Sequence, residues 1–386
     1  MSTETNNRRE ALQSLMKARS IDAFLITSPV HLYYMTETVF DGFYYVPAQG
    51  DGVQLVRRPV GYTGDNVVPF KSVRQLPGLL ADAGFAPPTL LALEDEELSY
   101  AEYTDLTRLF ASSEPTGGSI FLRTLRLIKS PHEIALLRAG ATVHDAVHGH
   151  IPALYRAGMT DWDFSVAIEH QIRLMGHLGI MRCAGMRLET CSAIVLSGDS
   201  AQTPSPYDYS LPGGGRHPSV PIGSDGHIMQ PGDTVNVDFC ENINGYLTDI
   251  TRTYAVDFIR PEAEKSHAVS LSILREMERT ARPGTLCCDL YARAWEIADQ
   301  AGYAHLFMGR TQQAKFIGHG IGLQVNEWPV LSKNDRTPLA PGMVIAIEPK
   351  LICPGVGPTG AENTYLVTED GLEKLTNCTE TLVVLR

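Results

Sequence analysis

The pattern of apolar and polar positions changes character near residue 125, and it predicts two domains. In the first part, residues 8–20 have the spacing of an amphipathic helix, and Ile21–Thr27 reads as a buried strand. Short apolar runs follow, separated by glycine and proline. This alternation indicates a small α/β domain over residues 1–122. The segment Ala111–Gly118, with its serines, proline and glycines, is the expected linker.

Longer helical patterns appear in the second part, residues 123–386. Ser130 is a predicted N-cap because Pro131 and Glu133 follow it, and the helix is expected to reach about Tyr155. Further helices are expected over residues 160–175 and 261–303, the latter with a break at Pro283-Gly284. The remaining residues return to short strands and turns. The second part therefore predicts a larger domain of mixed helix and strand, of the α+β class.

Two acids, Asp238 and Asp249, flank an Asn244-Gly245 pair that lies between two apolar runs. Asn-Gly in that setting is the strongest short-range signal for a β-hairpin. With a two-residue turn, Asp238 stands opposite Thr251, and Asp249 faces the same side as Asp238. Two carboxylates on one face repel each other unless a proton or a cation lies between them. The hairpin therefore predicts a cation site, with further acids and a histidine supplied from elsewhere in the chain.

Composition narrows the class of protein. The 386 residues carry a formal net charge of −12, which argues against nucleic acid or an anionic membrane as the main partner. The chain has no apolar run of about 18 residues, and its polar N-terminus lacks the apolar core of a signal peptide. The seven scattered cysteines suit a reducing compartment. We therefore expect a cytoplasmic protein whose partner is a small molecule or a short peptide.

Three more candidate ligands lie in the last eighty residues. His319 is flanked by glycines in FIGHGIG, Glu348 ends the apolar run GMVIAIE, and Glu362 opens the strand pattern ENTYLVT. A glutamate in a buried strand needs a partner. One imidazole with four carboxylates makes an oxygen-rich site that suits Mn, Fe, Co or Zn. Two such ions about 3.5–4 Å apart can share a water molecule and polarise a substrate oxygen.

The order Asp238, Asp249, His319, Glu348, Glu362 resembles a known family. The motifs VDF, GYLTDITRTY, GHGIG and PGMVIAIEP are similar to those of the pita-bread metallopeptidases, which include methionine aminopeptidase, aminopeptidase P, prolidase and creatinase. The segment RLIKSPHEIALLR resembles the first helix of that family's catalytic domain. The resemblance implies a pita-bread catalytic domain over residues 123–386, a creatinase/prolidase-type N-terminal α/β domain over residues 1–122, and a homodimer.

The resemblance also implies roles for these residues. Asp249 and Glu362 would bridge two divalent ions, Asp238 would complete one, and His319 with Glu348 would complete the other. The implied function is that of a hydrolase related to Xaa-Pro aminopeptidase and prolidase, in which metal-bound hydroxide attacks an amide carbonyl. Glu348 or Glu327 would then manage the proton.

Two histidines that peptidases of this family usually carry are not found at their expected positions. Asn326 stands where one of them is expected, and an amide side chain is no acid or base near neutral pH. His217 is the nearest upstream candidate for the other. It lies in residues 192–232, a segment rich in serine, proline and glycine that is expected to form one long loop. Asn326 and His217 are therefore candidate members of the catalytic set.

These departures leave other functions open. A small-molecule enzyme on the same scaffold, similar to creatinase, ectoine hydrolase or a dimethylsulfoniopropionate lyase, is the main alternative. A non-catalytic binding module is disfavoured because all five ligand types are present. Metal content and activity on Xaa-Pro peptides separate these readings.

Overall fold

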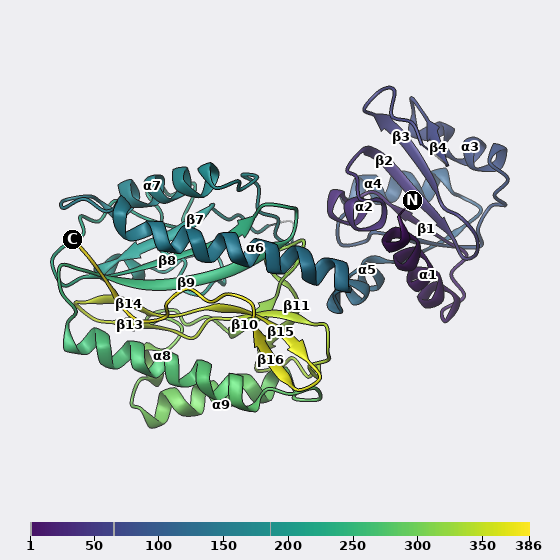
Figure 1. Cartoon of the computed structure of the whole chain (residues 1–386). Helices are drawn as coiled ribbons and strands as arrows, with labels where there is room; N and C mark the ends of the chain where they lie inside the picture. The colour runs from purple at the N-terminus through teal and green to yellow at the C-terminus, as the bar shows by residue number, and fades with distance from the viewer. Residues whose placement is uncertain (1, 65, 186) are drawn as a thin grey trace. The chain divides into compact units, whose positions relative to one another are not determined.

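The computed structural model describes residues 2–64, 66–185 and 187–386, and it forms two compact units (Figure 1). They divide between Arg126 and Leu127, whereas the sequence-based boundary lies after residue 122. The helix and strand content of both confirms the predicted α+β class. No helix in the described part of the chain is long and apolar enough to cross a membrane.

The N-terminal unit is built on a six-stranded sheet of order β4-β3-β2-β1-β5-β6. β1 pairs antiparallel with β2 and parallel with β5, and alternate apolar side chains on one face of the sheet, such as Leu25, Tyr45 and Leu93, belong to one core cluster. The prediction of a linker at Ala111–Gly118 is wrong, because Glu114–Gly117 pairs with Leu90–Leu93 as an edge strand. The elements are α1 (Thr3–Lys17), β1 (Ala23–Ile26), α2 (Pro29–Thr36), β2 (Asp41–Pro47), β3 (Val53–Arg58), β4 (Val67–Pro69), α3 (Leu76–Asp82), β5 (Leu90–Leu93), α4 (Tyr100–Leu109), β6 (Glu114–Gly117) and α5 (Ser119–Leu127).

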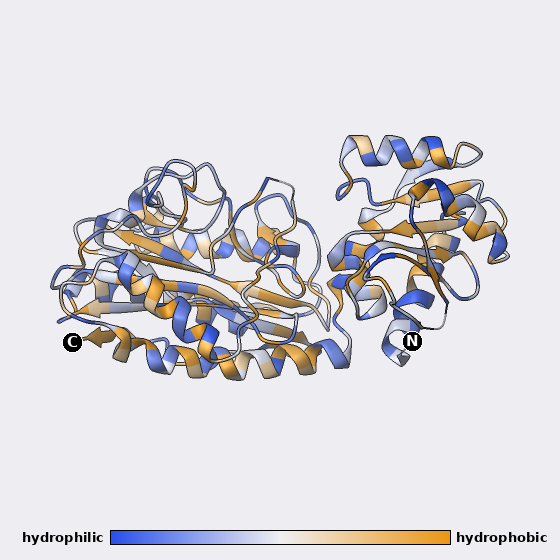
Figure 2. Cartoon of the chain, turned by 90° about the horizontal axis from the view of Figure 1, so that it is seen from above, coloured by the Kyte–Doolittle hydropathy of each residue, from blue (hydrophilic) through white to orange (hydrophobic). Residues whose placement is uncertain are grey.

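The C-terminal unit places sheets between two pairs of helices, α6 and α7 on one side and α8 and α9 on the other (Figure 1). The strands at the centre of this unit consist mostly of hydrophobic residues (Figure 2). The elements are α6 (Pro131–His150), α7 (Asp161–Leu174), β7 (Ala193–Ser197), β8 (Thr234–Asn242), β9 (Leu247–Val256), α8 (Pro261–Thr280), α9 (Cys287–Gln300), β10 (Phe316–Gly320), β11 (Glu327–Ser332), β12 (Val344–Ile347), β13 (Lys350–Cys353), β14 (Gly357–Gly360), β15 (Asn363–Thr368), β16 (Gly371–Lys374) and β17 (Val383–Leu385).

Local sequence signals explain where these elements begin. The Ser130 side chain accepts a hydrogen bond from the amide of Glu133, and the Glu133 carboxylate accepts one from the amide of Ser130, so α6 starts with a complete capping box. The helices predicted over residues 160–175 and 261–303 are confirmed as α7 and as α8 with α9. The predicted loop over residues 192–232 needs correction at its start, because Ala193–Ser197 pairs with β8 as strand β7.

The sheets bring the sequence motifs together. The first has the strand order β17-β9-β8-β7, the second has the order β11-β10-β12-β15-β16, and β13 pairs with β14 in a smaller third sheet. In the first sheet, β8 and β9 pair with Asp238 opposite Thr251 and Cys240 opposite Asp249, which confirms the register predicted from the Asn-Gly turn. The first and second sheets meet along β9 and β15, where the amide of Asp249 donates to the hydroxyl of Thr364 at 2.8 Å.

Candidate metal centre

Neighbouring strand positions carry the five predicted ligands. Asp238 and Asp249 lie within β8 and β9, and His319 lies within β10. Glu348 directly follows β12 and Glu362 directly precedes β15, and these two strands pair with Ile347 opposite Asn363. Antiparallel pairing therefore sets the two glutamates side by side at the same end of the two strands. The structure brings all five side chains into one cluster.

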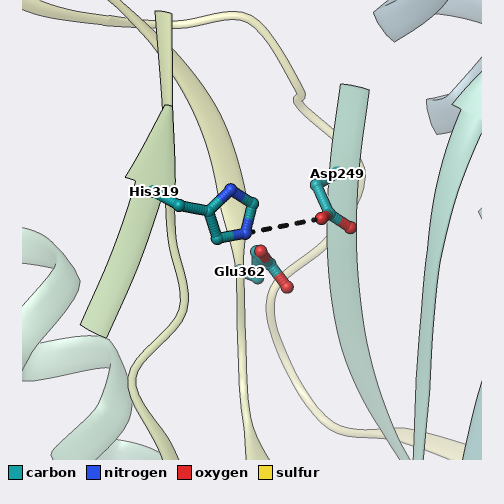
Figure 3. Close-up of side chains that lie close together, drawn as sticks. All are labelled: Asp249, His319 and Glu362. Atoms are coloured by element: carbon teal, nitrogen blue, oxygen red, sulfur yellow. Dashed lines mark ion pairs between the residues drawn. The ribbon is translucent and has the colours of Figure 1, made fainter. Parts of the chain in front are cut away.

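The cluster contains two groups that could each hold an ion. Asp249, His319 and Glu362 form the first group, and Asp238, Glu348 and Glu362 form the second. Within each group the candidate ligand atoms lie within 4.8 Å of one another. In Figure 3 the imidazole of His319 points at the carboxylates of Asp249 and Glu362, and its Nε2 is 3.8 Å from Asp249 Oδ2. Glu362 is common to both groups.

The first group fits a divalent ion. Within the described residues, Asp249 Oδ1 and Glu362 Oε1 are buried without a hydrogen-bond partner, an arrangement that is costly unless a ligand supplies one. Burial, and then the charge of Asp238, raise the pKa of Asp249 to about 7. Burial and the charge of Asp249 raise the pKa of Glu362 well above its usual range. A cation among these oxygens removes both penalties.

His319 is oriented as a ligand. Its Nδ1 lies 3.1 Å from the carbonyl oxygen of Gly320, which can only accept, so Nδ1 carries a proton and Nε2 is the nitrogen that faces the cluster. Burial lowers the pKa of this imidazole, but the carboxylates of Glu348 and Asp249 outweigh burial and raise it to about 9. A metal ion and a proton would therefore compete for Nε2.

The second group already contains a cation, the ammonium of Lys350. Its Nζ lies 2.7 Å from Asp238 Oδ2, 2.8 Å from Glu348 Oε2 and 3.3 Å from Glu362 Oε2. Burial lowers the pKa of Lys350, but these three carboxylates raise it well above its usual range. The sequence reasoning missed this residue. The available signal was its position two residues after Glu348, because side chains at that spacing point to the same side of an extended segment.

A cavity of about 210 Å³ opens onto the cluster, and Asp238, Asp249, His319 and Glu348 belong to its wall. The apolar side chains of Met181, Leu188, Ile194 and Phe316 form another part of the wall. Its wall includes a further acid, Asp208, and neither lysine nor arginine among the residues described. The cavity thus combines apolar surface with an excess of negative charge. Cys240 also faces it, and burial raises the pKa of this thiol well above its usual range.

The other predicted catalytic residues lie in different settings. Asn326 borders the cavity, but both ends of its amide bind Ala184: Oδ1 accepts from the amide at 2.7 Å and Nδ2 donates to the carbonyl at 3.0 Å. Glu327 is buried and is not among the residues that line the cavity, and its Oε2 accepts from Lys129 Nζ at 3.1 Å. His217 is exposed, hydrogen-bonds to Ser219, and is not among the residues that line the cavity. The structure does not bring His217 into the cluster.

Comparison with known proteins gives concordant matches. The pattern of metallopeptidase family M24 matches residues 135–369, and that of the creatinase/prolidase N-terminal domain matches residues 8–128. A Xaa-Pro dipeptidase of Pyrococcus furiosus is 28% identical over 376 residues, which cover 96% of this chain and 97% of the relative. A Xaa-Pro dipeptidase of Pyrococcus horikoshii is 26% identical, with 98% and 99% covered. The solved structure of a Xaa-Pro dipeptidase from Bacillus anthracis aligns with a TM-score of 0.81 at 25% identity, covering 99% of this chain and 100% of that one.

Proposed function

The chain belongs to metallopeptidase family M24 and is a metal-dependent hydrolase, and we propose that it cleaves the amide bond of short Xaa-Pro peptides. The observation that carries this proposal is the buried group of Asp249, His319 and Glu362, two of whose carboxylate oxygens lack a partner within the described residues. The group lies beside a cavity into which a short peptide can reach. The relatives named above are called Xaa-Pro dipeptidases, which supports the same substrate class.

A bound divalent ion supplies a Lewis acid that polarises the scissile carbonyl and lowers the pKa of water. The protein's own groups do the rest. His319 is fixed by Gly320 so that Nε2 faces the ion. Glu348 Oε2 is held by Lys350, which leaves Oε1, 3.5 Å from His319 Nε2, as the atom proposed to accept the proton of the attacking water. Glu327, held by Lys129, is a positioning residue in this proposal.

The wall of the cavity supports a small substrate that carries a positive charge. Its volume of about 210 Å³ is below the roughly 300–1,000 Å³ of pockets for drug-sized ligands. Its acids attract the free amino group of a peptide, and the part of the wall that the structure describes has no lysine or arginine to bind a carboxylate. A dipeptide or tripeptide with a free N-terminus fits both properties.

The identity of the metal ion, the number of ions and the homodimer are also proposals. Mn, Fe, Co or Zn suits the donor set of one imidazole and several carboxylates. The sequence predicts two such ions, one for each group, yet the second group already holds the ammonium of Lys350. The predicted homodimer and cytoplasmic location stay predictions, and light scattering of the purified protein tests the first.

The test is hydrolysis of Xaa-Pro dipeptides and tripeptides by the Mn-loaded protein, with matched Xaa-Ala peptides for comparison. We expect cleavage of the proline peptides, and its loss in Asp249→Ala. Failure of a fully metallated protein to cleave any amide substrate would refute the proposal. Cleavage of Xaa-Ala peptides at the same rate would refute the proline specificity alone.

A further inference from the structure

The ammonium of Lys350 lies in the middle of a group of oxygens that could otherwise hold an ion. Its three carboxylate contacts, at 2.7, 2.8 and 3.3 Å, are made to one oxygen each of Asp238, Glu348 and Glu362. The same three residues form the second group of candidate ligands. Lys350 therefore satisfies the oxygens that a second ion would need.

An ion and this ammonium exclude each other. A first-row divalent ion binds carboxylate oxygens at about 2.0–2.2 Å, so an ion shared by these residues would lie almost where Nζ lies. Within this group, Asp238 Oδ2 and Glu348 Oε2 each accept a hydrogen bond from Lys350 Nζ instead.

The lysine is held in place by its surroundings. Its side chain is 1% exposed. Its backbone is fixed in β13, where it pairs with Gly360, and its carbonyl accepts from the amide of Met308 at 2.8 Å. Gly360 makes room for the stem of the lysine, because a Cβ there would lie 2.9 Å from Lys350 Cα and 3.2 Å from its Cγ.

We propose that this protein binds one divalent ion per chain, at Asp249, His319 and Glu362, and that the Lys350 ammonium serves as a built-in cation in place of a second ion. The inference rests on the proposed metal-dependent function and concerns only the number of ions. One dication and one lysine leave the four carboxylates with an excess of negative charge, which suits a substrate with a positively charged amino group. Lys350 is a positioning residue that holds Glu348 and Asp238 in fixed orientations.

The first test uses the unmodified full-length chain. After loading with excess Mn²⁺ and removal of free metal by desalting, elemental analysis should give one Mn per chain. Electron paramagnetic resonance should show the six-line signal of an isolated Mn²⁺ and no spin coupling between two ions. Two ions per chain, or a spin-coupled pair, would overturn the inference while leaving the hydrolase proposal intact. No bound metal at all would overturn both.

The second test removes the cation. Lys350→Ala should bind two Mn²⁺ per chain and show spin coupling, because it opens both the space and the three carboxylates. The matched control is Lys374→Ala, which removes another lysine paired to a carboxylate, that of Glu380 at 2.8 Å, and Glu380 belongs to neither ligand group. The control should keep one ion. Retention of one ion by folded Lys350→Ala would overturn the inference, and if that variant does not fold, the measurement on the unmodified chain decides it.

Discussion

Thr251 holds Glu362 at two points. Its Oγ1 donates a hydrogen bond to Glu362 Oε2 at 2.6 Å, and its carbonyl accepts one from the Glu362 amide at 3.1 Å. The guanidinium of Arg252 fixes the Glu362 carbonyl from the same strand at 2.6 Å. Glu362 belongs to both ligand groups, so the middle of β9 sets the direction of the carboxylate that the whole centre shares.

Replacement of Thr251 by valine should therefore weaken metal binding while leaving the fold intact. Valine keeps the shape of threonine but cannot donate to Glu362, and loss of such an outer-shell partner typically costs about 10–100-fold in metal affinity. Mn²⁺ titration with a competing chelator measures the change. Thr251→Ser keeps the hydroxyl and is the control, with an affinity close to that of the unmodified protein. Equal affinities for the valine and serine variants would contradict the assigned role.

Replacement of Asp249 should have a larger effect than replacement of Thr251. Asp249→Asn keeps the size of the side chain but removes the charge of a buried group whose Oδ1 has no other partner within the described residues. The loss of metal affinity should exceed about 100-fold, the upper end of the range for outer-shell partners. Elemental analysis after desalting measures retained metal, and peptide hydrolysis should fall with it. Asp208→Asn, which changes another acid of the cavity wall, should retain the metal.

Glu241 gives the fold a pH dependence that is independent of the metal ligands. It is fully buried in β8, and burial raises its pKa from 4.5 to about 7 although the amide of Asn242 opposes the shift. The folded state therefore keeps a proton that the unfolded chain releases above about pH 4.5. The contribution of Glu241 to the free energy of unfolding is therefore greatest at low pH and is lost as the pH rises through 7.

Glu241→Gln should accordingly be more stable than the unmodified protein at pH 8, by up to about 3 kcal/mol. The difference should shrink towards pH 5, where the buried carboxyl is protonated. Urea unfolding at several pH values measures both free energies. The exposed Glu369→Gln is the control and should show no such gain. A gain for Glu241→Gln that stays the same at pH 5 and pH 8 would show that Glu241 is ionised in the folded protein.

Asn326 should act on substrate binding more than on the chemical step. Its amide holds Ala184 through two hydrogen bonds, and the neighbouring Met181 and Cys183 line the cavity. Asn326→Ala releases this segment and should raise KM by roughly five-fold, the equivalent of about 1 kcal/mol for a lost hydrogen bond. Steady-state kinetics should find kcat within about two-fold of the unmodified value. A fall in kcat at constant KM would instead place Asn326 in the chemistry.

Features that depend on neighbouring residues, such as turns, strand register and helix starts, could be predicted from the sequence. The Asn244-Gly245 turn was enough to place Asp238 opposite Thr251, because turn type fixes the register of the two strands that it joins. The capping residues at Ser130 likewise located the start of α6. The prediction of a linker at Ala111–Gly118 failed because small and polar residues are as typical of a short edge strand as of a linker.

Long-range contacts were beyond such reasoning. Asn326 and Ala184 are 142 positions apart, and only the tertiary fold brings them together. Lys350 reaches Asp238, 112 positions away, so the charge of the lysine bears on the metal centre only once two sheets have assembled. The distant acids could be grouped only through a family resemblance. Lys350 is not one of the residues that carry this resemblance, so the resemblance could not point to it.

The first ligand group draws one residue each from β9, β10 and the start of β15, so its members are dispersed over more than a hundred positions of the chain. An unfolded chain therefore offers no closely spaced ligands, and the ion binds essentially the folded state alone. Free metal at 100 times its dissociation constant then adds about 2.7 kcal/mol to the free energy of unfolding. Metal starvation would accordingly shorten the lifetime of the polypeptide in the cell, by exposing it to proteolysis, as well as halting its turnover of substrate.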